Sequence, residues 1–121
     1  MDDEAELKRF IAEEGLPDSF RRTVELNLVG SFNMLRLSAS AMAKNEPDAG
    51  GERGACVLTA SIAGYEGQIG QIAYGSAKAG VIGMTIIGAR DLAAVGVRVN
   101  TIAPGTIATP PMMMMPQAMR D

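Results

Sequence analysis

The feature that most constrains the fold is a short apolar run, residues 55–60, followed by a glycine-punctuated loop and a long helical pattern at 74–95. The run is partly β-branched and is bounded by loop residues, which predicts a short buried strand. A second apolar run, 97–102, predicts another strand after the helix, with Arg98 and Asn100 alternating outward. We therefore expect an α/β fold with a parallel sheet.

Three residues within and after the first strand predict a catalytic centre. Ser61 follows the strand directly, at the edge where open α/β sheets bind their ligands. Tyr74 and Lys78 are four residues apart, so a helix places both side chains on one face. A phenol is a poor acid or base at neutral pH, but a nearby ammonium stabilises the phenolate and makes proton transfer easier. Ser61 can then hold a carbonyl or alcohol oxygen while Tyr74 exchanges a proton with it.

A serine followed at this separation by Tyr-x-x-x-Lys resembles the short-chain dehydrogenase/reductase family. The pair Tyr74 and Lys78 alone would be weak evidence, because such pairs also occur on solvated helix faces. The resemblance implies an oxidoreductase that interconverts a secondary alcohol and a ketone with a nicotinamide cofactor. It further implies that Asn27, in the pattern N-x-x-G, helps to hold an ordered water in the proton relay behind Lys78. The simpler interpretation of Asn27 is a partly exposed side chain beside a tolerated glycine.

A second motif of the family follows the strand at 97–102. The segment from Pro104 to Thr109 matches the pattern P-G-x-x-x-T, although an ordinary Pro-Gly turn is the simpler alternative. In the family, the backbone after the glycine and the threonine hydroxyl approach the nicotinamide carboxamide. The resemblance therefore implies cofactor contacts from two regions of the chain, namely Asn27, Tyr74 and Lys78, and Pro104, Gly105, Ile107 and Thr109.

The turn that would bind the pyrophosphate of a dinucleotide is not evident. Gly64, Gly67 and Gly70 lie between a strand and a helix, but their spacing is not G-x-G-x-x-G, and the next strand ends at Ala103 rather than an acidic residue. We therefore expect the later half of a doubly wound, Rossmann-like sheet that lacks the N-terminal dinucleotide-binding half, and hence a truncated enzyme. The resemblance favours NAD, while NADP stays open because the discriminating residues belong to the missing half.

The substrate class follows from a finer resemblance. The loop NEPDAGGERG at 45–54, with GSFNMLRL before it and GMTIIGARDLA after it, resembles the 3-hydroxyacyl-CoA and hydroxysteroid dehydrogenases of this family. An acyl-CoA or a steroid is therefore the expected substrate. Two other functions stay open: a catalytically inactive fragment that acts as an oligomerisation module, and a serine hydrolase using Ser61 or Ser76 with Lys78. The hydrolase is remote because the S-x-x-K spacing is absent.

Composition excludes several other classes. The 121 residues are 47% hydrophobic and carry a net charge of −3, which predicts one globular domain without a basic nucleic-acid surface. We expect no membrane association and a cytoplasmic location, because neither a signal peptide nor an apolar run of membrane-spanning length is apparent. With no histidine and one cysteine, a structural zinc site is excluded. Cys56 falls in the first predicted strand and is expected to be a small buried side chain.

The domain reading places an amphipathic helix at 1–15, the catalytic half at 20–110 and an irregular Met-rich tail at 111–121. A long helix is expected from about Phe20 to Ala43, with Asp18 or Ser19 as its N-cap. Three glycines interrupt the later helix and suggest close backbone approach to another element, namely Gly80, Gly83 and Gly88. In the family the two long helices pack against their copies, so the resemblance implies a homo-oligomer.

Overall fold

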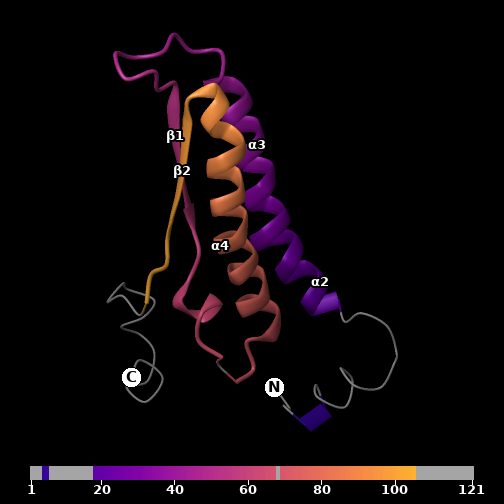
Figure 1. Cartoon of the computed structure of the whole chain (residues 1–121). Helices are drawn as coiled ribbons and strands as arrows, with labels where there is room; N and C mark the ends of the chain where they lie inside the picture. Colours follow the sequence, from indigo (N-terminus) through magenta and orange to yellow (C-terminus); the bar gives the residue numbers. More distant parts are fainter. Residues whose placement is uncertain (1–3, 6–17, 68, 106–121) are drawn as a thin grey trace, which may run out of the picture.

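The computed structural model describes residues 4–5, 18–67 and 69–105, and Figure 1 shows their arrangement. Glu4 and Ala5 are helical, and the rest of the helix predicted at 1–15 lies outside the described residues, as does the tail at 111–121. The first long helical run comprises α2 (Asp18–Val24), a π-helical turn η1 (Glu25–Val29) and α3 (Gly30–Met42). The remaining elements are β1 (Gly54–Thr59), the 3-10 turn η2 (Ile62–Gly64), α4 (Ile72–Leu92), the 3-10 turn η3 (Ala93–Val95) and β2 (Val97–Ile102).

The two strands pair in parallel, from Gly54 opposite Val97 to Thr59 opposite Ile102. Helix α4 forms the crossover between them, as a parallel pair requires. Both long helices lie on one face of the strands, with α3 beside α4 (Figure 1). The predicted α/β class, both predicted strands and their parallel pairing are confirmed.

The core lies between the strands and the helices. Its buried cluster contains residues from all four long elements, namely Leu35, Ala39, Cys56, Leu58, Ala60, Val81, Val97 and Val99. Alternation along each strand turns one set of side chains toward the helices and the other set away from them. On the second face, Val57 is 63% exposed and Ile102 is 54% exposed. The buried free thiol of Cys56 confirms its predicted role as a small core side chain.

The first helical run differs from the prediction in two ways. It begins at Asp18, so Asp18 and Ser19 both lie inside the helix. The prediction that one of them is the N-cap is therefore wrong. The run also contains the π-helical turn, in which the Gly30 N–H donates to the Glu25 carbonyl. Local side chains accompany this widening, because Asn27 Nδ2 donates to the Thr23 carbonyl at 3.0 Å. Such local bonds compete with regular helix geometry.

The interior glycines of α4 only partly behave as predicted. A Cβ on Gly80 would lie 2.8 Å from Leu28 Cδ1, and one on Gly88 would lie 3.4 Å from Leu35 Cδ2. These two positions therefore allow the first helical run to approach α4 closely. A Cβ on Gly83 would meet no atom within 4 Å, so the expectation of close approach is wrong there. Gly96 follows η3 with φ of 74° and ends the helix in the left-handed conformation, directly after the helical pattern predicted at 74–95.

One sequence expectation about α4 needs correction. Residues 72–95 form a helix long and apolar enough to cross a membrane by length and composition, with mean hydropathy 1.3 and 17% of the window buried. The expectation that no apolar segment reaches membrane-spanning length is therefore wrong. The segment contains several glycines and one lysine, so it is not an unbroken run of large apolar residues. The face of this helix that carries Val81 packs against the strands, as in the core helix of a sheet protein.

Candidate active site

Ser61 lies at the point where β1 ends and the chain turns. The sheet bonding extends one residue past the strand, because the Ala60 N–H donates to the Ile102 carbonyl at 2.8 Å. Ser61 is extended, and its Oγ accepts a hydrogen bond from the Ala63 N–H at 3.1 Å. The hydroxyl therefore caps η2 and is held at the carboxyl edge of the sheet, where the sequence predicted it.

Tyr74 and Lys78 lie one turn apart on α4, and the structure brings their side chains together. Lys78 Nζ lies 5.5 Å from the centroid of the Tyr74 ring. Lys78 is only 9% exposed, and its ammonium donates to the Thr59 carbonyl at 3.0 Å. A buried charge is costly unless it is paired or hydrogen-bonded, and here the carbonyl and the aromatic face supply that stabilisation. The structure thus brings the predicted pair together near the end of β1, with Lys78 buried and Tyr74 half-buried.

Two glycines place the Ser61 turn directly on α4. A Cβ on Gly64 would lie 3.0 Å from the Ala79 nitrogen, and a Cβ on Gly75 would lie 3.0 Å from the Ala63 carbonyl oxygen. Both distances are shorter than ordinary packing allows, so side chains there would push the turn away from the helix. This role of Gly75 was not predicted from the sequence. A glycine next to Tyr74 in the first turn of a helix could have indicated that another segment approaches the helix there.

The loop after β2 reaches the same edge of the sheet. The Ile62 N–H donates to the Pro104 carbonyl at 3.2 Å. A Cβ on Gly105 would meet Ile62 Cδ1 at 3.5 Å. The structure therefore brings Pro104 and Gly105 alongside the residue that follows Ser61. Two further predicted cofactor residues, Ile107 and Thr109, lie outside the described residues.

Asn27 lies in the π-helical turn, which packs against α4. The side chain of the next residue, Leu28, packs against Gly80, which follows Lys78 by two positions on α4. The Asn27 amide is used within its own helix, and the Asn27 carbonyl accepts from Ser31 Oγ at 2.6 Å. The structure thus places Asn27 on an element that packs against α4, the helix that carries Tyr74 and Lys78. π-helical turns of this kind are frequent at functional sites.

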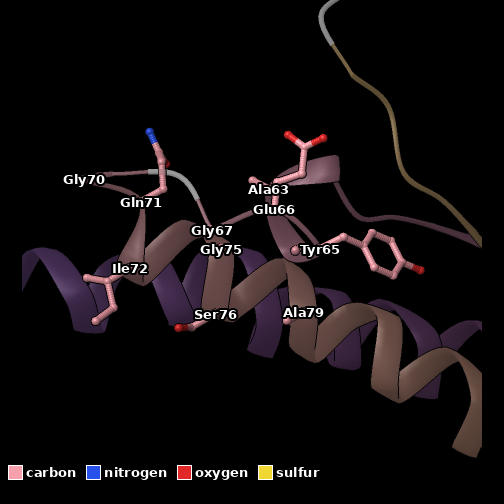
Figure 2. Close-up of a pocket in the computed structure, with 11 residues that line it drawn as sticks. Ala63, Tyr65, Glu66, Gly67, Gly70, Gln71, Ile72, Gly75, Ser76 and Ala79 are labelled. Carbon is pink, nitrogen blue, oxygen red and sulfur yellow. The ribbon is translucent and has the colours of Figure 1, made fainter.

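An open cavity of about 500 Å³ adjoins the beginning of α4. The loop at 63–67 and 70–72 lines it, together with Gly75, Ser76 and Ala79 (Figure 2). Figure 2 shows the Gln71 and Glu66 side chains pointing away from α4. Tyr74 and Lys78 are not among its lining residues. Lys78 reaches β1 instead, where its ammonium donates to the Thr59 carbonyl. The sequence reading did not anticipate this cavity.

Comparisons with known proteins agree with this geometry. The model of the short chain dehydrogenase family matches residues 7–120. The chain is 51% identical to rat 3-hydroxyacyl-CoA dehydrogenase type-2 over 104 residues, covering 86% of this chain and 40% of the rat protein. It is also 51% identical to the human protein of the same name over 100 residues, covering 83% of this chain and 38% of the human protein. The chain thus spans about two-fifths of the length of these relatives.

Solved structures show the same relationship. The crystal structure of 3-hydroxyacyl-CoA dehydrogenase type-2 from Mycobacterium avium has a TM-score of 0.80 and 56% identity, covering 88% of this chain and 43% of that one. A 3-oxoacyl-[acyl-carrier protein] reductase from Brucella melitensis with bound NAD has a TM-score of 0.66 and 37% identity, covering 83% and 36%. These similarities confirm the predicted resemblance to the family and, in its finer form, the resemblance to 3-hydroxyacyl-CoA dehydrogenases. With a serine, a tyrosine and a lysine gathered at the carboxyl edge of a parallel sheet, the chain belongs to the short chain dehydrogenase family.

Proposed function

We propose that this chain carries the catalytic side of an oxidoreductase that interconverts a secondary alcohol and a ketone. The observation that carries the proposal is the buried Lys78 ammonium beside the Tyr74 ring, at the strand end that Ser61 follows. The printed names of the relatives favour a 3-hydroxyacyl-CoA as substrate. A hydroxysteroid is the second substrate class, from the resemblance of the loop at 45–54.

Each catalytic residue has a distinct role in the proposal. Ser61 Oγ donates a hydrogen bond to the substrate oxygen and holds it beside the phenol. Tyr74 gives a proton to that oxygen during ketone reduction and removes one during alcohol oxidation. The Lys78 ammonium stabilises the phenolate form of Tyr74, and Asn27 supports the relay that returns the proton to solvent. Ser61 can perform this role if its hydroxyl turns away from the Ala63 N–H or accepts and donates at once.

The residues at the site fit the nicotinamide end of NAD. Tyr74, Lys78 and the backbone of Pro104 and Gly105 lie at one sheet edge, and Gly105 is exposed there without a side chain. When bound, the cofactor supplies or accepts the hydride. Lys78 and Asn27 would hold its ribose side, and Pro104, Gly105, Ile107 and Thr109 would hold its carboxamide side. NAD is favoured over NADP by the similarity to the Brucella melitensis reductase with bound NAD.

The two long helices support a homo-oligomer. Large apolar side chains are exposed along α3 and α4, namely Phe32, Met34, Leu37, Ile86 and Ile87. Contiguous apolar surface of this kind usually marks an interface. We infer that a second copy packs on these two helices. The same observation favours the alternative function, in which the chain is an inactive oligomerisation module.

The proposal is tested in a chimera. The matched region of the Mycobacterium avium enzyme is replaced by residues 18–105 of this chain, and NADH oxidation is followed with a 3-ketoacyl-CoA and with a ketosteroid. We expect turnover of the acyl-CoA, and we expect Ser61→Ala to lower kcat by about 10²-fold. Ser76→Ala is the matched control, because Ser76 lies on the cavity face of α4 and should leave kcat unchanged. A chimera that folds and oligomerises without turnover would favour the oligomerisation module.

A further inference from the structure

We propose that the Ser31 hydroxyl fixes the π-helical turn η1, and that Ser31 is thereby a positioning residue for Asn27. Ser31 itself touches neither substrate nor cofactor in this account. The proposal rests on the proposed function for its catalytic consequence, because Asn27 is assigned there to the relay that returns the proton to solvent. Its structural part, the fixing of η1, is independent of that assignment.

The first step is the change of backbone pairing at η1. In an α-helix each N–H donates to the carbonyl four residues earlier, whereas in a π turn it donates to the carbonyl five residues earlier. The Gly30 N–H follows the second pattern and donates to the Glu25 carbonyl. Carbonyls beside such a turn lose backbone donors, and a backbone polar group in a packed fold needs a partner. Side chains that donate to those carbonyls therefore favour the π turn over the regular helix.

The second step is the pair of side chains that supply such donors. Each donates to the carbonyl four residues earlier: Asn27 Nδ2 to that of Thr23 at 3.0 Å, and Ser31 Oγ to that of Asn27 at 2.6 Å. The bond from Ser31 lies near the short end of the range for hydroxyl donors. It ties the beginning of α3 to the middle of η1. Ser31 therefore holds the residue to which the relay is assigned.

The third step is the face of the helical run on which these residues lie. Thr23, Asn27 and Ser31 are half-buried at intervals of four, and Leu35, four residues further, is buried against Gly88 of α4. Four residues of regular α-helix overshoot one full turn by about 40°, so a row at this spacing drifts around the helix. A wider turn removes part of this drift. The π turn thus keeps the hydrogen-bonded row in line with the side that meets α4.

The position of η1 matters for the chemistry because η1 packs closely on α4. A Cβ on Gly80 would lie 2.8 Å from Leu28 Cδ1, and Gly80 follows Lys78 by two positions. Without the bond from Ser31, η1 can return to regular helical pairing, which rotates Asn27 and Leu28 relative to α4. We expect this rotation to move the Asn27 side chain with respect to Lys78 and to slow the return of the proton.

The structural part is tested by NMR on the full 121-residue chain. In Ser31→Ala, the ¹³C resonance of the Asn27 carbonyl should shift, and the Gly30 amide should exchange with solvent about tenfold faster. Ser31→Thr keeps a hydroxyl that can reach the same carbonyl, so both readouts should stay as in the unmodified chain. Ser38→Ala is the matched control, because Ser38 is another half-buried serine of α3, about two turns further along. An unchanged Asn27 resonance and Gly30 exchange rate in Ser31→Ala would overturn the proposal.

The catalytic part is tested in the chimera described above. We expect Ser31→Ala to lower kcat about tenfold and to raise the solvent deuterium isotope effect, because a slower proton return then limits turnover. KM for the 3-ketoacyl-CoA should stay within about twofold. Ser31→Thr should restore kcat, and Ser38→Ala should leave it unchanged. In an Asn27→Ala background, Ser31→Ala should lower kcat no further, because residues that act as one unit are not additive.

The outcomes separate this proposal from the proposed function. Full kcat in Ser31→Ala, an equal loss in Ser38→Ala, or an additive loss in the double variant with Asn27→Ala would overturn the positioning role. A chimera without any turnover would contradict the proposed function instead. The NMR readouts involve no catalysis, so they still support or overturn the fixing of η1 by Ser31.

Discussion

The two ends of the same pair of strands differ in what their side chains do. At the amino end, which we call the closed end, the Arg53 N–H donates to the Gly96 carbonyl at 2.7 Å, and Asn45 Nδ2 donates to the Arg53 carbonyl at 2.9 Å. At the carboxyl end, which we call the open end, the Ala60 N–H likewise donates to the Ile102 carbonyl, but Ser61 and the buried Lys78 also lie there. Side chains at the closed end hold the strands together, whereas those at the open end are the ones to which we assign chemistry.

The largest expected change in stability lies at the closed end, in Gly96→Val. Gly96 has φ of 74°, and a Cβ there would lie 2.5 Å from the Gly51 carbonyl oxygen. Backbone strain and the clash together should lower the free energy of unfolding by roughly 3 kcal/mol, measured by urea denaturation. Gly51→Val is the control, because Gly51 has φ of 82° but a Cβ there would meet no atom within 4 Å, so it should show the strain alone. Equal losses in both variants would show that close approach at Gly96 does not matter.

A smaller loss is expected for Arg53→Met. Arg53 Nε donates to the Asn45 carbonyl at 3.1 Å, and its Nη1 donates to the Val95 carbonyl at 3.4 Å. Losing these two bonds should lower the free energy of unfolding by about 1–2 kcal/mol. Arg98→Met removes an ion pair with Glu52 between two exposed side chains and should cost at most about 0.5 kcal/mol. If Arg98→Met lowers the free energy of unfolding as much as Arg53→Met does, then the Arg53 hydrogen bonds do not hold this end of the strands together.

The smallest change in stability, with the clearest change in activity, is expected at the open end in Gly75→Ala. Alanine favours the helix by about 1 kcal/mol over glycine, but its Cβ would press on the Ala63 carbonyl, so the two effects should nearly cancel. The displaced Ser61 turn should lower kcat of the chimera. Gly83→Ala meets open space on the same helix and should stabilise the fold without changing kcat. Loss of activity in both variants, or in neither, would show that the contact between Gly75 and Ala63 does not fix the position of the Ser61 turn.

The sequence predicted what depends on local pattern. Both strands follow from apolar runs, and the helix between them follows from the helical pattern at 74–95; all three elements were predicted. The relation of Tyr74 to Lys78 also followed, because helical spacing fixes it. The predicted N-cap at Asp18 or Ser19 was wrong, because the preference of these residues for the N-cap does not by itself fix the residue at which a helix begins.

What the sequence could not predict depends on contacts between distant segments. Three features depend on how the elements pack. They are the contact of Ala63 with Gly75, the hydrogen bond from Lys78 to Thr59 and the π-helical turn at Asn27. The expectation that Gly83 approaches another element failed for the same reason. An interior glycine shows that a contact is permitted, but only the fold shows whether one is made.

The central claim is that the open end is a site of proton transfer, and Tyr74→Phe in the chimera tests it most directly. The account predicts that kcat for the 3-ketoacyl-CoA falls by about 10²–10⁴-fold while NADH binding, followed by fluorescence, stays within a small factor of the unmodified chimera. Tyr65→Phe is the matched control, because Tyr65 is the only other tyrosine, lies in the exposed loop and should keep full activity. Retention of most of kcat in Tyr74→Phe, or an equal loss in Tyr65→Phe, would contradict the account.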